Sequence, residues 1–509
     1  GEIKILKQIF QSLSTGSIEI VEVPTPAISS GNLLIRTSKT LLSAGTERML
    51  LDFGRANLIE KARQQPEKVK QVLEKAKNEG PFNAIDAVRS KLNNPLPLGY
   101  CNIGRVIGIG EGVTGFKEGD RVVSNGPHSE IVNVPKNLCS LIPSNVSDEE
   151  AVFTILSSIG LQGIRLAEPT LGETFLVSGL GLIGLLTGQL LAAQGCRVLG
   201  IDINSSRCHL AESLGITSHC LSETSNPLSW CQAQTDGNGI DGAIITAATS
   251  SNSPIDLASQ ACRQRGRIVL VGVTGLELRR ELFYKKELSF QVSCSYGPGR
   301  YDASYEEDGN DYPFGLVRWT EQRNFQAVLN VMSQKRLITE KLISHKFLFE
   351  KANEAYETMA TDVNHLGIIL EYDNTKVINK QKIEFKEDKI LDISLNEKPS
   401  IGFIGAGNYA SRILLPNFKK CGAFLHTIAS KSGSGISHIG KKFNFLYATT
   451  DLEELINSSE CDAIIISTRH DSHGDLVLQS LKAGKHVYVE KPLCLNINEL
   501  RDIETCLNK

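Results

Sequence analysis

A glycine-rich turn between an apolar run and a helical run constrains the fold of this chain most strongly. Residues 175–193 read FLVSGLGLIGLLTGQLLAA, which is nearly long and apolar enough to mimic a membrane span. However, Gly179, Gly181 and Gly184 follow a β-branched run and precede a helical one, which predicts a strand, a tight turn and a buried helix. Asp202 ends the next predicted strand. The glycines let a pyrophosphate approach the helix N-terminus and Asp202 can bind a ribose 2′-hydroxyl, so we predict an NAD site.

A second glycine motif of the same kind lies near the end of the chain. Gly405, Gly407 and Ala410 follow the apolar run SIGFI. The next predicted strand ends at Ser430 and Lys431, where the first motif has its acid. A cation in place of a carboxylate suits a 2′-phosphate, so this second fold is expected to take NAD or NADP. The alternative is that Lys431 is only a solvated loop residue.

The order of strand-like and helical runs predicts an α/β protein with two nucleotide-type folds. Short strands broken by Gly and Pro indicate a β-rich domain over residues 1–155. Strands and helices alternate over residues 156–295, which predicts a doubly wound parallel sheet. Residues 296–374 end in a helix and a strand that we assign back to the first domain. The Lys-rich stretch 375–398 is the expected linker, although its alternating part could form an edge strand, and residues 399–509 form the second nucleotide fold.

Composition narrows the class of partner. The 509 residues are 41% hydrophobic and 22% charged, with a formal net charge of −3 and no basic block, so neither nucleic acid nor a membrane is expected as a partner. The twelve cysteines form no C-x-x-C pair, which argues against a disulfide framework. Because no signal peptide opens the chain, we expect a cytoplasmic protein that acts on a small molecule, with assembly into a homo-oligomer left open.

These motifs resemble two known families. The series ISSGNLLIRT, SAGTE, GRVIGIGEGVTGFKEGDRV and GLGLIG is similar to the medium-chain (zinc-type alcohol) dehydrogenase superfamily over residues 1–374. From Pro399 on, GFIGAGNYA, TRHDSH and GKHVYVEKPL resemble the Gfo/Idh/MocA oxidoreductase family. The resemblance implies a GroES-like barrel and a Rossmann domain, followed by a second Rossmann domain that corresponds to the N-terminal half of its family. The fusion resembles bacterial two-domain oxidoreductases often linked to cell-surface polysaccharide synthesis.

The comparison with the zinc enzymes singles out Tyr100. Those enzymes have Cys-Gly-Thr-Asp where this chain has Ala44 to Glu47, and Gly-His-Glu where it has Gly99-Tyr100-Cys101. Cys101 and His128 alone fall short of three protein ligands, so the sequence predicts a site without zinc. Hydride transfer then needs a protein proton donor.

Tyr100 is the expected donor, with Glu47, Ser43 and His128 as relay partners. The alternative makes Tyr100 a packing residue in a site that has lost its chemistry.

Three further groups of residues are candidates for the chemistry. Tyr296, Arg300, Arg318 and Trp319 belong to a loop that follows the first nucleotide fold, where arginines could clamp an anion and aromatic rings could stack on a sugar. The alternative is an irregular loop held by its own polar contacts. In the second fold, resemblance gives Lys491 the role of donating a hydrogen bond to the substrate oxygen, and puts His473 near the cofactor.

The sequence therefore favours an NAD(P)-dependent oxidoreductase that acts on a sugar, a sugar nucleotide or a polyol. The word sugar depends on resemblance alone. A non-catalytic dinucleotide-binding scaffold or redox sensor is the competing hypothesis.

Overall fold

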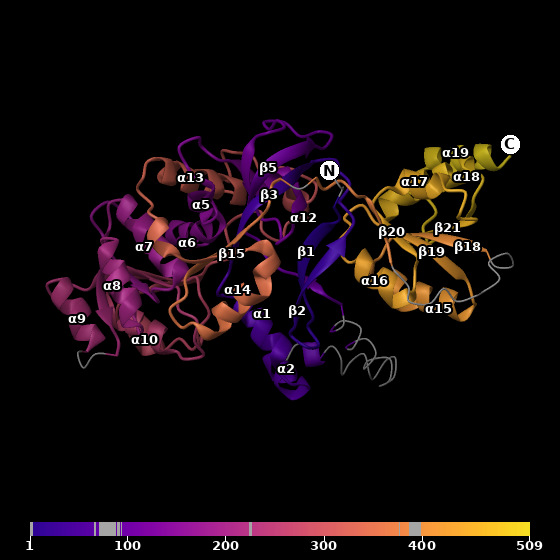
Figure 1. The fold of residues 1–509 in the computed structure, drawn as a ribbon. Helices are drawn as coiled ribbons and strands as arrows, with labels where there is room; N and C mark the ends of the chain where they lie inside the picture. Colours follow the sequence, from indigo (N-terminus) through magenta and orange to yellow (C-terminus); the bar gives the residue numbers. More distant parts are fainter. Residues whose placement is uncertain are drawn as a thin grey trace.

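The computed structural model describes residues 4–65, 68–70, 88, 92, 94–222, 226–375, 377–385 and 399–508. Along the chain it forms a β-rich domain, a first parallel sheet covered by helices, and a second such sheet (Figure 1). We call residues 4–375 the first module and residues 377–508 the second module. The mixed sheets and helices confirm the predicted α/β fold class.

The β-rich domain consists of two sheets that pack together through two hydrophobic clusters. Strands β2, β1 and β4 form a three-stranded antiparallel sheet, and the order β15-β16-β3-β5-β6-β8, with β7 beside β3, forms a seven-stranded sheet. The strand bounds are β1 Leu6–Gln11, β2 Ile18–Val23, β3 Asn32–Leu42, β4 Leu96–Pro97, β5 Asn102–Ile109, β6 Arg121–Ser124, β7 Ile131–Pro135, β8 Cys139–Leu141, β15 Ile343–Leu348 and β16 Gly367–Glu371. The helices are α1 Thr46–Arg55, α2 Leu58–Gln64, α5 Asp148–Ala151, α12 Ala303–Glu306, α13 Glu321–Ser333 and α14 Ala352–Thr361. Because β16 pairs antiparallel with β3, the chain returns to this sheet after the first nucleotide fold.

The first parallel sheet has the strand order β11-β10-β9-β12-β13-β14. The order reverses between β9 and β12, and ligands of open α/β sheets bind at such a switch point, beyond the carboxyl ends of the strands. The strands are β9 Thr174–Ser178, β10 Arg197–Asp202, β11 Thr217–Cys220, β12 Ile240–Ile245, β13 Cys262–Leu270 and β14 Ser289–Val292. The helices are α6 Thr154–Ala167, α7 Leu182–Ala193, α8 Ser205–Ser213, α9 Pro227–Gln234, α10 Ser253–Ala261 and α11 Arg280–Tyr284.

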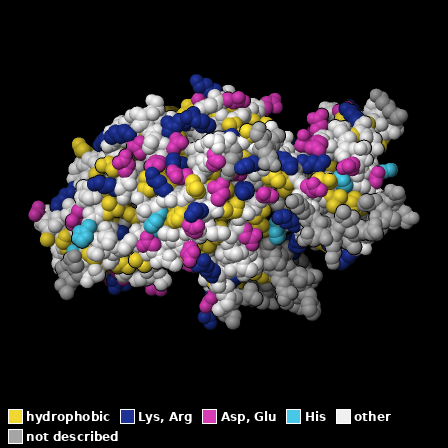
Figure 2. Space-filling view, viewed as in Figure 1, with side chains coloured by type: hydrophobic (Ala, Val, Ile, Leu, Met, Phe, Trp, Pro, Cys, Tyr) yellow, Lys and Arg dark blue, Asp and Glu magenta, His cyan; other side chains and the backbone are white. Residues whose placement is uncertain are grey.

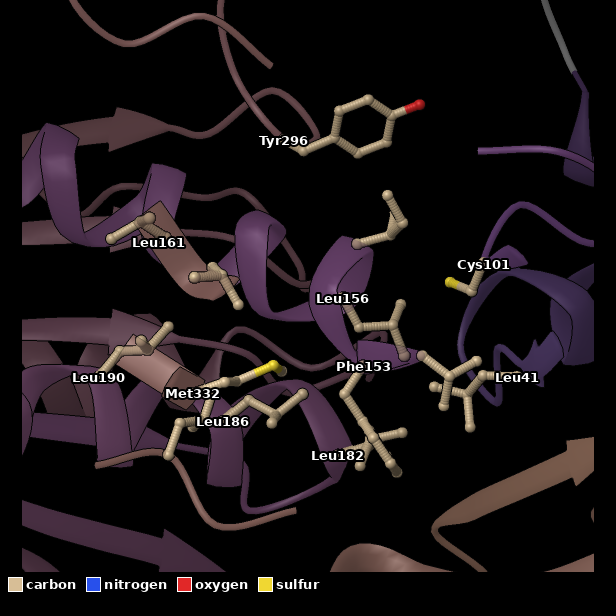
Figure 3. Packing of buried hydrophobic residues seen from close by; sticks show 14 of the residues in the cluster. Leu41, Cys101, Phe153, Leu156, Leu161, Leu182, Leu186, Leu190, Tyr296 and Met332 are labelled. Atoms are coloured by element: carbon tan, nitrogen blue, oxygen red, sulfur yellow. The ribbon is translucent and has the colours of Figure 1, made fainter. Parts of the chain in front are cut away.

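One hydrophobic core joins the β-rich domain to the first parallel sheet. Helix α6 carries Leu156 into this core, and Figure 3 shows Leu156 between Cys101 on the barrel side and Leu186 of α7 on the other. All three side chains are at most 1% exposed. Burial of each large apolar side chain contributes about 1.5–3 kcal/mol, so this core fixes the two parts of the first module relative to each other.

The second module repeats the parallel architecture with the strand order β17-β20-β19-β18-β21-β22. Its strands are β17 Lys382–Glu384, β18 Ser400–Ile404, β19 Phe424–Ala429, β20 Tyr447–Thr449, β21 Ala463–Ile466 and β22 His486–Val489. Its helices are α15 Leu415–Lys420, α16 Ile436–Phe443, α17 Leu452–Asn457, α18 His473–Lys482 and α19 Ile497–Leu507, with a π-helical turn over Ala410–Leu414. Strand β17 comes from the stretch predicted as a linker and pairs antiparallel with β20, because its alternation buries Ile383.

The distribution of charged side chains and the length of the helices fit the mixed charge and moderate hydrophobic content of the sequence. Lys/Arg and Asp/Glu side chains are interspersed over the face seen in Figure 2. In the part of the chain that the structure describes, no helix has both the length and the apolar character needed to cross a bilayer. The apolar run that mimics a span in the sequence forms β9 and the buried helix α7.

Candidate functional site

The first glycine motif forms the tight turn that joins β9 to α7. Gly179 has a φ of +101°, which side-chain-bearing residues rarely adopt, and a Cβ on Gly184 would come within 1.8 Å of the Gly179 carbonyl oxygen. A Cβ on Gly181, the N-cap of α7, would have only an Arg207 nitrogen at 4.0 Å. Two glycines therefore close the turn, and the third leaves open the space at the helix N-terminus where a pyrophosphate binds.

Asp202 lies at the end of β10 beside this turn. Its Oδ2 accepts a hydrogen bond from the Leu180 amide at 2.6 Å, and its Oδ1 accepts one from the Asn204 amide at 2.8 Å. Arg207 Nη1 is 4.0 Å from the same carboxylate. Asp202 thus holds the glycine turn and also presents a carboxylate where a ribose would lie.

Tyr100 is held by hydroxyl groups that precede and begin helix α1. Its hydroxyl oxygen is 2.6 Å from Ser43 Oγ and 3.3 Å from Thr46 Oγ1. Burial first, and then the neighbouring Cys101, raise the pKa of the Tyr100 phenol above its ordinary value. The phenol therefore stays protonated at neutral pH and can donate a hydrogen bond or a proton.

Glu47 lies beneath Tyr100 in a buried network but does not bond to it. One carboxylate oxygen accepts the Ser43 amide at 2.9 Å, and the other is 3.2 Å from His128 Nε2 and accepts the Tyr356 hydroxyl. Glu47 is 1% exposed and His128 is fully buried. Burial, followed by the charge of Glu47, raises the pKa of Tyr356. The sequence named Glu47 and His128, and the structure brings both to Tyr100 through Ser43.

The network continues away from Tyr100 through residues that sequence reasoning missed. His128 Nδ1 is 2.7 Å from Thr40 Oγ1, which in turn is 3.1 Å from the Tyr372 hydroxyl. Gly99, with a φ of +92°, permits this arrangement because a Cβ there would come within 2.6 Å of the His128 ring. Tyr356 and Tyr372 follow the first nucleotide fold in the sequence, so no local pattern could have connected them with Tyr100.

The four predicted substrate residues fall into two groups. Tyr296 is 4% exposed, packs against Phe325 and accepts a hydrogen bond from Asn125 Nδ2 at 3.3 Å. Arg300 donates to Glu306 at 2.7 Å, and its guanidinium lies 5.6 Å from the Tyr296 ring centroid.

The second group centres on the Trp319 ring. The guanidinium carbons of Arg165 and Arg318 lie 3.4 and 3.8 Å from the centroid of this ring. Two guanidinium groups this close to one centroid must occupy opposite faces of the ring. Burial and then the like charge of Arg318 lower the pKa of Arg165 to about 10.

Glu321 lies fully buried beside Glu306, and we expect it to make stability depend on pH. Burial and the Glu306 charge raise the pKa of Glu321 from 4.5 to about 9. Between these values the folded chain binds one more proton than the unfolded chain, so stability falls as the pH rises through this window. Glu321→Gln removes the titration. The melting temperature of the first module should therefore fall less between pH 6 and pH 9 than in the unmodified chain. The exposed Glu340→Gln is the control, and parallel pH curves for all three proteins would refute the assignment.

In the second glycine motif, as in the first, one glycine closes the turn and another leaves space open for a ligand. Gly405 has a φ of +108°, and a Cβ there would come within 2.2 Å of the Ser467 carbonyl oxygen, whereas a Cβ on Gly407 would meet nothing within 4 Å. Ala410 is fully buried and starts the π-helical turn. Ser430 is half-buried and Lys431 exposed at the end of β19, on one wall of a cleft that also includes Gly407.

His473 positions the loop that carries Lys491. Its two ring nitrogens lie 2.7 Å from the Pro492 carbonyl oxygen and 3.2 Å from that of Thr468. His473 is fully buried, whereas Lys491 lines the same cleft as Gly407. The structure thus brings the predicted residues of the second fold to one cleft. His473 holds the loops that border this cleft through its bonds to the Pro492 and Thr468 carbonyl oxygens.

Two families match separate parts of the chain. Residues 183–307 match the family described as "Zinc-binding dehydrogenase", and residues 400–509 match "Oxidoreductase family, NAD-binding Rossmann fold". An uncharacterized zinc-type alcohol dehydrogenase-like protein of Escherichia coli is 24% identical over 308 residues, which cover 53% of this chain and 80% of that protein. L-arabinitol 4-dehydrogenase of Aureobasidium melanogenum is 27% identical over 299 residues, covering 52% and 74%. The solved structure of 2R,3R-butanediol dehydrogenase from Bacillus subtilis has a TM-score of 0.55 and 18% identity, and covers 72% of this chain and 100% of that chain.

These matches define a two-module protein in which a dehydrogenase is joined to an oxidoreductase module. The chain is an NAD(P)-dependent dehydrogenase. The predicted oxidoreductase class is confirmed, in preference to the non-catalytic scaffold.

The prediction that the chain takes no zinc is contradicted by the same matches, which point to a zinc-binding family. The prediction depended on Ala44 and Tyr100 in place of metal ligands, and on Cys101 and His128 as the two ligand-type residues that were counted. It did not weigh that Glu47 and His128, both of ligand-forming type, come together in the barrel. Within the described ranges, no three or more His, Cys, Asp and Glu side chains are grouped so that they could hold a metal ion. The residues present therefore do not form a complete ligand set, and no step below passes through a metal.

Proposed function

We propose that the first module transfers a hydride between NAD(P) and an alcohol or carbonyl carbon of a polyol or sugar. The observation that carries this proposal is the Tyr100 phenol, protonated and held 2.6 Å from Ser43 Oγ. The substrate class is supported by relatives named for L-arabinitol and butanediol. A role in cell-surface polysaccharide synthesis, with a sugar or sugar nucleotide as the substrate, is a finer part of this proposal and has only the resemblance of the fusion behind it.

The residues of the chain supply the proton side of the reaction. The glycine turn with Gly181 would hold the pyrophosphate of NAD(P), whose nicotinamide would supply or accept the hydride. In the direction of reduction, the Tyr100 hydroxyl donates a hydrogen bond to the carbonyl oxygen and gives up its proton as the carbon is reduced. The buried Ser43 hydroxyl donates a hydrogen bond to the resulting phenolate, and solvent returns a proton to the phenolate through the hydroxyl of the exposed Thr46, which lies 3.3 Å from the Tyr100 oxygen. Oxidation of the alcohol follows the same path in reverse.

Glu47 is a positioning residue in this scheme. By accepting the Ser43 amide, it fixes the turn before α1 whose hydroxyl contacts Tyr100. His128 and Tyr356 in turn hold the carboxylate. A network with each polar group paired keeps the phenol in one position, which acid catalysis requires.

The second module is proposed to bind a second dinucleotide, with Lys491 as the donor to a substrate oxygen. Gly407 leaves the space for a pyrophosphate, and Lys431 is suited to the ribose end. Small polyhydroxylated molecules are the substrate class for this module too.

A panel of polyols, ketoses and sugar nucleotides tests the proposed function. The full chain is mixed anaerobically with each compound and with NAD or NADP, or with their reduced forms. We expect the absorbance of reduced nicotinamide to change at multiple turnovers for at least one polyol or sugar. Turnover only with simple alcohols, and none with any polyol or sugar, would overturn the substrate class.

Asp202 is expected to make the first module prefer NAD over NADP. Its carboxylate would repel a 2′-phosphate, while Arg207 is 4.0 Å away and would be free to pair with that phosphate once the charge is lost. Asp202→Asn keeps the size of the side chain and one acceptor. It should raise the affinity for NADP relative to NAD by about tenfold, which corresponds to about 1.4 kcal/mol. Titration of both cofactors by nicotinamide fluorescence measures this ratio, and an unchanged ratio would remove Asp202 from cofactor selection.

A further inference from the structure

A large cleft lies between the two modules. Its volume is about 1280 Å³, and its walls come from both parts of the chain. The second module contributes the glycine turn with Gly407, the end of β19 with Lys431, and Lys491. The wall that the first module contributes combines apolar residues, the carboxylate of Glu307 and six polar uncharged side chains, which are Gln8, Ser29, Ser30, Asn32, Ser129 and Asn133. Protein sites for small ligands have volumes of about 300–1,000 Å³, so this cleft has room for a dinucleotide.

Hydrogen bonds to backbone carbonyl oxygens join the first module to the ribose end of this cleft. The Ala27 amide donates to the Lys431 carbonyl oxygen at 3.0 Å, and Thr450 Oγ1 donates to the Thr25 carbonyl oxygen at 2.5 Å. Gly433, with a φ of +68°, allows this approach because a Cβ there would lie 2.5 Å from the Pro24 carbonyl oxygen. The turn that contains residues 24–30 therefore lies directly against the loop that follows β19.

Ser29 is the residue of this turn best placed to contact a ligand. Asn133 Nδ2 donates to Ser29 Oγ and to the Ala27 carbonyl oxygen, both at 3.0 Å, which fixes the turn. Among the described residues none accepts the hydrogen of the Ser29 hydroxyl, whereas Ser30 donates its own to Glu111. Ser29 is half-buried and lines the cleft, so it has a donor free for a ligand in the cleft.

A dinucleotide on the second module has to pass this turn. Its pyrophosphate belongs at Gly407, and its adenosine ribose belongs at the end of β19, where Ser430 and Lys431 lie. Because the Ala27 amide bonds to Lys431 itself, the next residues of the first module, up to Ser29, border the space for the adenosine half. Arg469 of the second module pairs with Glu307 of the first at 2.8 Å, which adds a third contact between the modules at this cleft.

We propose that the adenosine half of the second module's dinucleotide is bound between the modules, and that Ser29 of the first module donates a hydrogen bond to it. This inference rests on the proposed function, because it assumes that the second module binds a dinucleotide. Its consequence is that the affinity of the second cofactor site depends on residues of the first module.

Hydrogen exchange of the full chain, with and without NAD or NADP, tests where the dinucleotide lies. We expect protection of residues 405–410 and 430–434, and also of the first-module turn 27–31. Gly407→Val fills the open space for the pyrophosphate, where an added Cβ meets nothing within 4 Å. In this variant the protection of all three segments should be lost, while that of residues 179–184 and 202–207 remains.

Two substitutions at Ser29 give a second measurement. Ser29→Ala removes the donor and should weaken dinucleotide binding at the second site by about threefold to tenfold, the usual effect of one hydrogen bond. Ser29→Glu replaces the donor with a larger, negatively charged acceptor beside the adenosine half and should weaken binding of the negatively charged dinucleotide further. Ser144→Glu, at an exposed position of the same domain outside the cleft, is the matched control and should leave both sites unchanged.

The outcomes distinguish failure of this inference from failure of the proposal that the second module binds a dinucleotide. Protection of 405–410 and 430–434 without protection of 27–31, together with unchanged affinity in Ser29→Glu, would overturn the inference and leave the second cofactor site standing. No protection of 405–410 by either cofactor would overturn both.

Discussion

Replacing Tyr100 by Phe is expected to slow the chemical step of the first module by about 100-fold or more. The substitution removes only the hydroxyl that bonds to Ser43 at 2.6 Å and keeps the ring volume. Loss of a positioned acid or base usually costs a factor of about 10²–10⁴. Folding and NAD(P) affinity should survive, because the glycine turn and Asp202 are untouched. Single-turnover absorbance of the reduced nicotinamide measures the step directly.

The pH profile and a companion variant make this test specific. Because burial raises the pKa of the Tyr100 phenol above its ordinary value of 10.0, the rate of reduction should not fall through phenol ionisation below about pH 10. Lys491→Ala lies in the other module and should leave first-module turnover nearly unchanged. Full activity in Tyr100→Phe, combined with loss of all activity in Lys491→Ala, would reverse the assignment and move catalysis to the second module.

The features that the sequence predicted well are those encoded locally. Gly179, Gly181 and Gly184 lie within six consecutive residues, and the backbone requirement of each is set by the turn that they form. The same holds for Gly405 and Gly407. Strand and helix periodicity therefore indicated two nucleotide folds and the barrel before any contact was known.

The features that could not be predicted depend on side chains far apart in the sequence. Tyr356 is 309 residues from Glu47, yet it donates to the carboxylate at the centre of the buried network. Arg318 and Trp319 were grouped with Tyr296 because they share a loop. The structure places Arg165 of helix α6 on the face of the Trp319 ring opposite Arg318, a contact that no motif had indicated. Metal use was misjudged for a related reason, since ligand-type residues were counted along the sequence and the approach of Glu47 to His128 was not weighed as a pair of ligands.

The contacts between the two modules could not be predicted from the sequence either. Neither module's motifs indicate that the turn around Ser29 should lie against the loop after β19, because each fold is consistent with its own sequence pattern alone. The Ala27–Lys431 and Thr25–Thr450 hydrogen bonds are contacts between the two folds. Cofactor binding in one fold can therefore depend on the other.

Replacing Glu47 by Ala is expected to destabilise the first module by about 3 kcal/mol or more. Glu47 is 1% exposed, and its loss leaves the Ser43 amide, the His128 ring and the Tyr356 hydroxyl without their acceptor in a buried place. Each buried group left unpaired costs about 1–3 kcal/mol, and a cavity adds to this cost. Calorimetry of the full chain should show the first-module transition at a lower temperature and the second-module transition unchanged.

Two further variants show whether the stability depends on the hydrogen bonds of the Glu47 carboxylate or only on a side chain that fills its space. Glu47→Gln keeps the volume and one acceptor oxygen, so it should melt between the unmodified chain and Glu47→Ala. Glu118→Ala, at an exposed position of the same domain, removes a carboxylate without burying an unpaired group and should change stability by less than about 0.5 kcal/mol. If Glu47→Ala melts together with Glu118→Ala, the carboxylate does not hold the turn that carries Ser43, and the support proposed for Tyr100 must come from elsewhere in the barrel.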